Sequence, residues 1–364
     1  MFAQQPYDRR RFLGVGALSL AAAWVGTRDS VMQLVTVKPF VPSSASDLAS
    51  LGRATAWLNS APLTAADLQG KVVLVDFWTY TCINWLRTVP YVRAWAARYK
   101  ERGLVVIGVH TPEFTFEEDV DNVRRSVQER GITYPIAIDN DRAIWHGFGN
   151  HYWPALYFID GGGMVRGHHF GEGNYEESEM RIRELVAASG RGGAIERESV
   201  SPEAHGPEVG ADWGSLRSPE TYVGHQKAEN FSSPGGASVN TSHLYAVPPR
   251  LRLNQWALSG EWTVKGETAA LNAAGGRIAY RFHARDLHLI MGPAVRRGVV
   301  PFRVSIDGQP PGAIHGSDVD EHGTGTVREQ RLYQLIRQSG PIADRQFEIE
   351  FIEGGVEAYA FTFG

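Results

Sequence analysis

Between residues 71 and 188 the chain alternates short apolar runs with stretches of helical periodicity, and this alternation limits the fold more than any other feature. The runs KVVLVDFW (71–78) and GLVVIGVH (103–110) are almost continuously apolar, which is typical of strands covered on both faces. Between them, apolar residues of 84–99 recur at the spacing of one helix face. The sequence therefore predicts an α/β domain, with a mixed sheet flanked by helices, at residues 50–189.

A second domain of a different kind is predicted further along the chain. Residues 250–364 alternate apolar and polar side chains with period two, as in Phe302, Val304 and Ile306, which predicts an all-β sandwich of half-buried antiparallel strands. Residues 190–249 are rich in Gly, Ser, Pro and Glu and show no sustained period. We interpret them as a partly ordered linker that runs over the surface.

The first thirty residues have the features of an export signal. Three arginines at 9–11 precede an apolar run that reaches Val25 and ends among small residues, which predicts a twin-arginine signal over residues 1–30. The expected location is periplasmic or otherwise extracytoplasmic, and an uncleaved signal would tether the protein to the membrane. The net charge of −4 gives no reason to expect nucleic acid as a partner.

Cys82 is the single cysteine of the chain, so an internal disulfide is excluded. It directly follows the first predicted strand, at the first turn of the next helix, where free N–H groups and the helix dipole favour the thiolate. We interpret Cys82 as a candidate nucleophile, with an inert buried side chain as the alternative. His110 and Glu113 should reach the same sheet edge, where His110 could hold a proton that Glu113 orients; loop packing is the alternative for this pair.

These residues carry a resemblance to a known family. VLVDFWTYTCINW (73–85) resembles the active-site strand and helix of thioredoxins, with Asp76 and Cys82 in register, and HYWPALYFID (151–160) resembles the second signature, which implies a cis bond at Pro154. The likeness is strongest to exported redoxins of the TlpA and DipZ type. It implies a thioredoxin-like fold followed by a jelly roll related to carbohydrate-binding modules, with Trp153 beside the substrate groove.

The chain departs from that family at one position of its active site. Trp85 stands where the pattern Cys-x-x-Cys has its resolving cysteine, so a mixed disulfide formed by Cys82 must be released by an external thiol. The resemblance gives Asp76 a role in deprotonating the second cysteine, which is missing here. Asp76 therefore either keeps a role in proton transfer or is only a buried carboxyl group that is hydrogen-bonded or protonated. Trp85 is expected to fill the space beside Trp78 and the loop before Pro154, and to limit access to the sulfur.

The leading hypothesis is therefore monothiol exchange with thiol- or disulfide-bearing proteins or small thiols, with any membrane electron donor acting in trans. One alternative is one-cysteine peroxide reduction, because Thr79-x-x-Cys82 matches part of the peroxiredoxin pattern, although Val75 stands where a proline is expected. Another alternative is a catalytically inactive binding scaffold with a glycan- or partner-binding jelly roll.

Two features of the second domain are ambiguous. Trp256, Trp262 and Tyr333 could form an aromatic platform for a glycan, or could be core residues. Asp318, Asp320 and His322 have a spacing that could ligate a hard cation, but a solvated turn is the preferred interpretation. No cofactor and no metal site is predicted.

Overall fold

The computed structural model describes residues 46–190 and 198–364, which belong to one compact unit. The predicted signal of residues 1–30 and the start of the predicted linker lie outside these described residues. In the part that is described, no helix combines the length and the apolar character needed to cross a bilayer.

The first domain is built on a six-stranded mixed sheet in the order β1-β4-β3-β2-β5-β6. Its central strands β2, β3 and β4 are parallel; β1 pairs antiparallel with β4, β5 with β2, and β6 with β5. The strands are β1 (Ala56–Leu58), β2 (Val72–Trp78), β3 (Leu104–His110), β4 (Ile136–Ile138), β5 (Ala155–Ile159) and β6 (Val165–Phe170). The helices are α1 (Ser46–Ala49), α2 (Ile83–Tyr99), α3 (Val120–Glu129), α4 (Ala143–Gly147) and α5 (Tyr175–Ala188).

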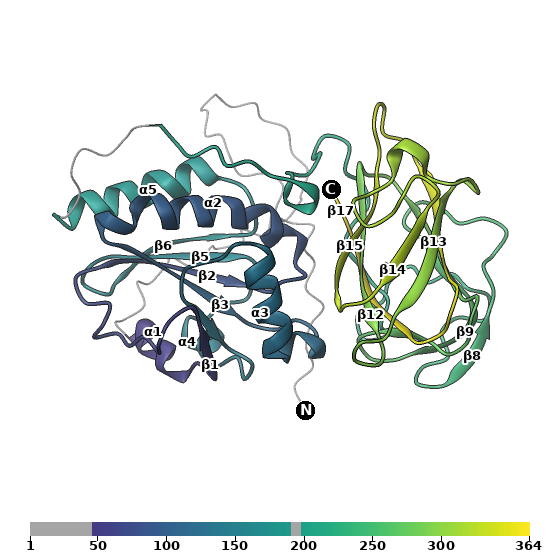
Figure 1. Ribbon diagram of the computed structural model, residues 1–364, viewed down its shortest axis with the longest axis horizontal. Helices are drawn as coiled ribbons and strands as arrows, with labels where there is room; N and C mark the ends of the chain where they lie inside the picture. Colours follow the sequence, from purple (N-terminus) through teal and green to yellow (C-terminus); the bar gives the residue numbers. More distant parts are fainter. Residues whose placement is uncertain (1–45, 191–197) are drawn as a thin grey trace, which may run out of the picture. The chain divides into compact units, whose positions relative to one another are not determined.

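Helices cover both faces of this sheet, and Figure 1 shows α2 and α5 on one face with α1 and α4 on the other. The side chains of β2 alternate between the two faces, as a pleated strand requires. Leu74 and Trp78 pack in the core beneath α2, α3 and α5, whereas Val75 and Phe77 pack with α1 and α4. This alternation aims Asp76 at the α2 face, beneath the start of that helix. The fold is thioredoxin-like, as the sequence predicted.

The second domain is an all-antiparallel sheet of 11 strands that fits a β-sandwich. Its strands are β7 (Thr221–Tyr222), β8 (Ser242–Tyr245), β9 (Trp256–Val264), β10 (Ala269–Leu271), β11 (Arg277–Phe282), β12 (Asp286–Pro293), β13 (Val300–Ile306), β14 (Thr324–Val327), β15 (Arg331–Arg337), β16 (Arg345–Phe351) and β17 (Val356–Phe363). The beginning of β9 pairs with β11 and its end pairs with β10, so β9 joins two groups of strands. Gly260 allows the change of direction, because its φ is 92° and a Cβ there would lie 2.9 Å from the Gly276 Cα.

Residues 198–249 contribute two strands to the second domain, because β7 pairs with β17 and β8 pairs with β9. Trp256, Trp262 and Tyr333 are at most 1% exposed and belong to the sandwich core, so they form no exposed platform. Their period-two positions face inward, and both indole N–H groups donate to backbone carbonyls of the same domain. A glycan ligand would need other residues.

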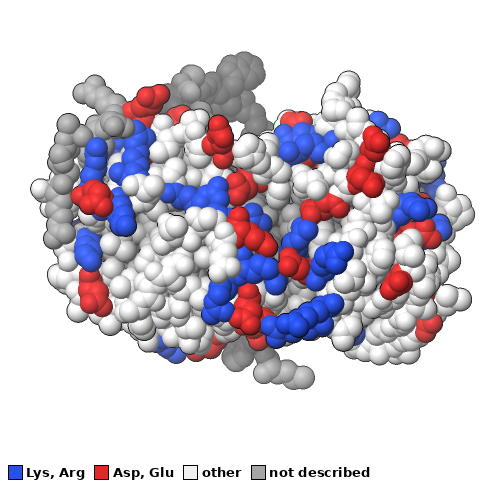
Figure 2. Space-filling model, viewed as in Figure 1, with Lys and Arg blue, Asp and Glu red and all other residues white. Residues whose placement is uncertain are grey.

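The loop proposed for a cation is a hydrogen-bonded turn. Asp320 accepts from the backbone N–H groups of His322 and Thr324, and Asp318 accepts from Arg331 and from the N–H of Gln334. Within the described residues, no three His, Cys, Asp or Glu side chains are grouped so as to hold a metal ion. Basic and acidic side chains are interspersed on the face shown in Figure 2.

Candidate active site

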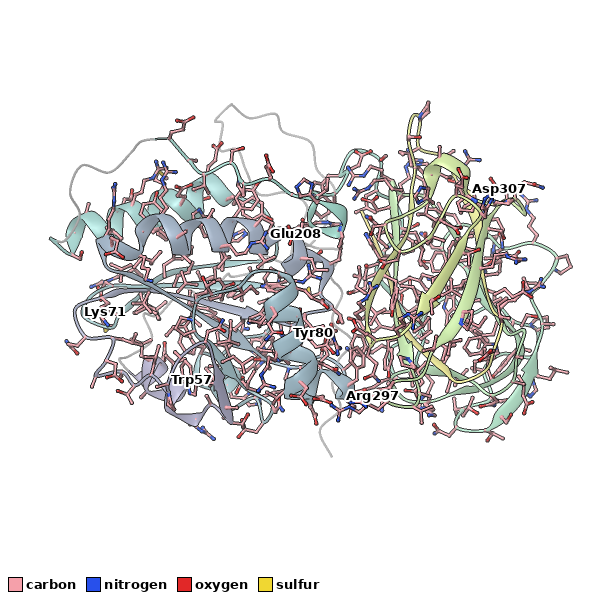
Figure 3. All side chains as sticks on the ribbon, in the orientation of Figure 1. Trp57, Lys71, Tyr80, Glu208, Arg297 and Asp307 are labelled. Carbon is pink, nitrogen blue, oxygen red and sulfur yellow. The ribbon has the colours of Figure 1, made fainter. Side chains whose placement is uncertain are left out.

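Cys82 lies at the N-cap of α2, in the turn that follows β2 and contains Tyr80, which is labelled in Figure 3. The Cys82 N–H donates to the Thr79 carbonyl at 3.2 Å, and the Cys82 carbonyl accepts from Leu86 at 2.9 Å. The side chain is 7% exposed, and its Sγ lies 3.8 Å from the backbone carbonyl oxygen of Trp153. The sulfur therefore sits at a helix start, next to the segment that carries Pro154.

The Trp153–Pro154 peptide bond is cis, as the resemblance implied. The Trp153 indole is half-buried and donates to the Thr111 carbonyl at 3.0 Å. Its ring lies 4.3 Å from that of Trp145, and the Arg142 guanidinium lies over it at 5.4 Å from the ring centroid. This packing holds the Trp153 carbonyl beside the sulfur of Cys82.

Trp85 makes two buried contacts, with Trp78 and with Asp76, and the sequence predicted only the first. Its ring stacks on Trp78 with centroids 4.2 Å apart, as expected from the sequence. Its indole N–H also donates to Asp76 Oδ2 at 3.1 Å. Asp76 therefore has a hydrogen-bond partner although the second cysteine is missing, because the indole N–H of Trp85 fills that position. An indole only donates and does not titrate, so it cannot exchange a proton with Asp76 as a thiol would.

Asp76 is fully buried. Desolvation raises its pKa to about 7, and the hydrogen bond from Trp85 acts in the opposite direction. The second carboxylate oxygen, Oδ1, has no hydrogen-bond partner among the described residues. The protonated and ionised forms of Asp76 are therefore close in free energy near neutral pH.

His110 and Glu113 do not form the pair that the sequence suggested. Glu113 accepts from the Tyr222 hydroxyl at 2.5 Å and from Lys227 at 3.3 Å, both of which lie outside the first domain. His110 is fully buried, with its ring edge-to-face on Trp78, and desolvation lowers its pKa to about 3. Its ring nitrogens make no hydrogen bond with another described residue. Because Glu113 is engaged elsewhere and desolvation disfavours the protonated form of His110, this arrangement does not support a relay between the two residues.

Glu117 is a buried carboxyl group that sequence reasoning missed. It is fully buried and accepts hydrogen bonds from the Thr81 hydroxyl at 2.5 Å and from the N–H groups of Glu113 and Phe114 at 2.7 and 3.0 Å. Burial raises its pKa to about 6. Glu117 precedes two other acidic residues, and nothing in the local sequence distinguishes the buried one from the two that follow it.

Comparisons with known proteins agree with this geometry. The model of the AhpC/TSA family matches residues 54–168, and the model of the thioredoxin-like C-terminal domain matches residues 218–364. Protein DipZ of Mycobacterium bovis is 39% identical over 259 residues, which cover 70% of this chain and 36% of DipZ. Thiol-disulfide oxidoreductase YkuV of Bacillus subtilis is 32% identical over 36% of this chain and 88% of YkuV.

A solved structure of a thioredoxin-like protein in its oxidized form is 31% identical, with a TM-score of 0.35, and covers 37% of this chain and 90% of that one. The chain spans only about a third of the length of DipZ, at 36%. The match to nearly the whole of YkuV, together with the strand order and the position of Cys82, shows that the chain belongs to the thioredoxin-like redoxin family, whose members include thiol-disulfide oxidoreductases.

Proposed function

We propose that this protein is an extracytoplasmic thiol-disulfide exchange protein that acts through Cys82 alone. The observation that carries the proposal is the placement of Sγ at the start of α2, 3.8 Å from the Trp153 carbonyl. The free N–H groups of the first helical turn stabilise a thiolate there. The backbone of Trp153 offers hydrogen-bonding groups to an extended substrate segment beside the sulfur.

The proposed reaction has two exchange steps. The Cys82 thiolate attacks one sulfur of a substrate disulfide, a new S–S bond forms, and the other substrate sulfur leaves as a thiolate that takes up a proton. An external thiolate then attacks the substrate sulfur of this mixed disulfide, and Cys82 leaves as a thiolate. The substrate disulfide is the oxidant and the external thiol is the reductant. Trp85 cannot perform the second step, because its indole has no sulfur.

Glutathione disulfide is a suitable probe for the first step. The purified protein should gain one glutathione on Cys82, detected as a mass increase on the tryptic peptide that contains this residue, and iodoacetamide should block the reaction. A Cys82→Ser variant should gain none. If wild-type Cys82 reacts with neither reagent in the folded state, the exchange function is wrong and the scaffold hypothesis gains support.

The proposed partners are thiol- or disulfide-bearing proteins or small thiols, with a membrane electron donor acting in trans. Export is supported by the arginine-rich apolar segment of residues 1–30, and the protein would remain tethered if that segment were not cleaved. Peroxide reduction, in which the peroxiredoxin pattern uses a threonine and an arginine to polarise the peroxide, has less support. Arg87, the first arginine after Cys82, is 2% exposed and donates to Glu172 and to the Phe363 carbonyl, so it is already engaged.

A further inference from the structure

The loop of residues 113–118, which includes a 3₁₀ helix at Thr115–Glu118, lies between β3 and α3 and against the turn that carries Cys82. Its contact with that turn is made by Glu117, whose Oε1 accepts from the hydroxyl of Thr81 at 2.5 Å. Thr81 immediately precedes Cys82, and both Thr81 and Glu117 are fully buried. Burying a carboxyl group costs free energy unless the group is hydrogen-bonded. The hydrogen bond from Thr81 therefore favours one position of the Glu117 side chain against the turn.

The second oxygen of Glu117 fixes the carboxyl group to its own loop. Oε2 accepts from the N–H groups of Glu113 and Phe114, so the two oxygens of one side chain join two separate loops. Through these hydrogen bonds, the side chain of Glu117 restrains the residue just before Cys82. Glu117 takes no part in the two exchange steps proposed for Cys82.

The loop of residues 113–118 is itself held on its other side. The rings of Phe114 and Phe116 lie 5.3 and 4.6 Å from the Tyr359 ring on β17. Thr115 donates through its N–H and its hydroxyl to Glu267 Oε2, at 3.2 and 2.8 Å. Aromatic packing and charge-assisted hydrogen bonds therefore hold the loop that carries Glu117 in place while Glu117 binds Thr81.

We propose that Glu117 is a positioning residue for Cys82, which fixes Thr81 and thereby holds the sulfur beside the Trp153 carbonyl for attack on an extended disulfide substrate. The inference rests on the proposed function of Cys82. A loosened turn would still expose the thiolate to a small alkylating reagent. It would present the sulfur less accurately to a disulfide, because the attacking sulfur and the two sulfurs of the disulfide must align during exchange.

The test compares two rates at Cys82, one with glutathione disulfide and one with iodoacetamide, both followed by mass spectrometry of the folded protein. Thr81→Val removes the hydroxyl but keeps the shape of the side chain, and Glu117→Gln removes the charge. Both variants should lower the ratio of the disulfide rate to the alkylation rate by at least about fivefold, because misplacing a reacting group slows an aligned reaction. Thr81→Ser restores the hydroxyl and should return the ratio to that of the wild type.

Thr88→Val is the matched control, because the Thr88 hydroxyl donates to the Asn84 carbonyl on the same helix and has no hydrogen bond to Glu117. It should leave the ratio unchanged. Wild-type ratios in both Thr81→Val and Glu117→Gln would overturn the inference, as would a failure of Thr81→Ser to differ from Thr81→Val. If one substitution prevents folding, the other decides by the same criterion. A wild-type protein that reacts with neither reagent would instead refute the proposed function of Cys82.

Discussion

At the scale of single residues, Trp85 explains how this domain keeps a buried aspartate without a second cysteine. The indole packs beside Trp78 and donates its N–H to Asp76, so the buried carboxyl group keeps a hydrogen-bond partner. The substitution therefore changes the resolution step and leaves the surroundings of Cys82 folded.

The raised pKa of Asp76 predicts a specific dependence of stability on pH. The folded-state pKa of about 7 lies above the unfolded value of 3.8, so the folded protein holds this proton more tightly. Its contribution to the free energy of unfolding is fully present below about pH 4 and is lost as the pH rises through 7. Each pH unit between the two pKa values corresponds to about 1.4 kcal/mol, so the loss amounts to a few kcal/mol.

Asp76→Asn removes this titration and keeps an oxygen for the Trp85 N–H. Urea unfolding of both proteins at pH 4.5, 6 and 7.5 should show wild-type stability falling relative to the variant as the pH rises. His110 and His288, whose pKa values burial lowers to about 3, destabilise both proteins alike in acid and cancel in the difference. A difference that does not change with pH would contradict the assignment.

At the scale of secondary-structure elements, the sequence predicted what depends on local pattern. The apolar runs identified β2 and β3, the helical spacing identified α2, and the position of Cys82 between strand and helix followed from both. The sequence could not show that Glu113 pairs with Tyr222, because these residues are 109 positions apart. Glu117 was missed for a related reason, since its burial depends on how two loops pack and leaves no periodic signal.

Gly108 on β3 is an element-scale feature that the packing of Trp78 requires. A Cβ at this position would lie 2.6 Å from Ile136 Cδ1 and 2.9 Å from Trp78 Nε1. Gly108→Ala should therefore displace the indole and reduce the free energy of unfolding by about 1–3 kcal/mol, measured in urea. Gly52→Ala is the control, because a Cβ there meets nothing within 4 Å. Equal stability of the two variants would show that the strand relaxes without cost.

At the scale of the whole molecule, Arg87 links three segments that are distant in sequence. It comes from α2, forms a 2.9 Å ion pair with Glu172 after β6, and donates to the Phe363 carbonyl at the end of β17 at 3.1 Å. Both side chains of the pair are nearly fully buried, at 2% and 8% exposure. Burial raises the pKa of Glu172 and Arg87 opposes this shift, so the carboxyl group depends on its partner.

Arg87→Met leaves that carboxyl group buried without a counter-ion, and removing one member of such a pair costs about 3–5 kcal/mol. Thermal and urea unfolding should show this loss. The double variant Arg87→Met with Glu172→Gln should recover much of it, because no unpaired charge then remains. A single variant as stable as the double variant would mean that the ion pair contributes little to holding these segments together.

The single-cysteine mechanism is tested by the lifetime of the mixed disulfide between Cys82 and glutathione after free glutathione disulfide is removed. In the wild type the adduct should persist until an external thiol is added, because Trp85 cannot attack it. In Trp85→Cys the second thiol should release glutathione and leave an internal disulfide. Mass spectrometry detects this disulfide because the protein is lighter by two hydrogens than the same variant with both thiols reduced. Spontaneous loss of glutathione from the wild type at the rate of Trp85→Cys would contradict the single-cysteine account.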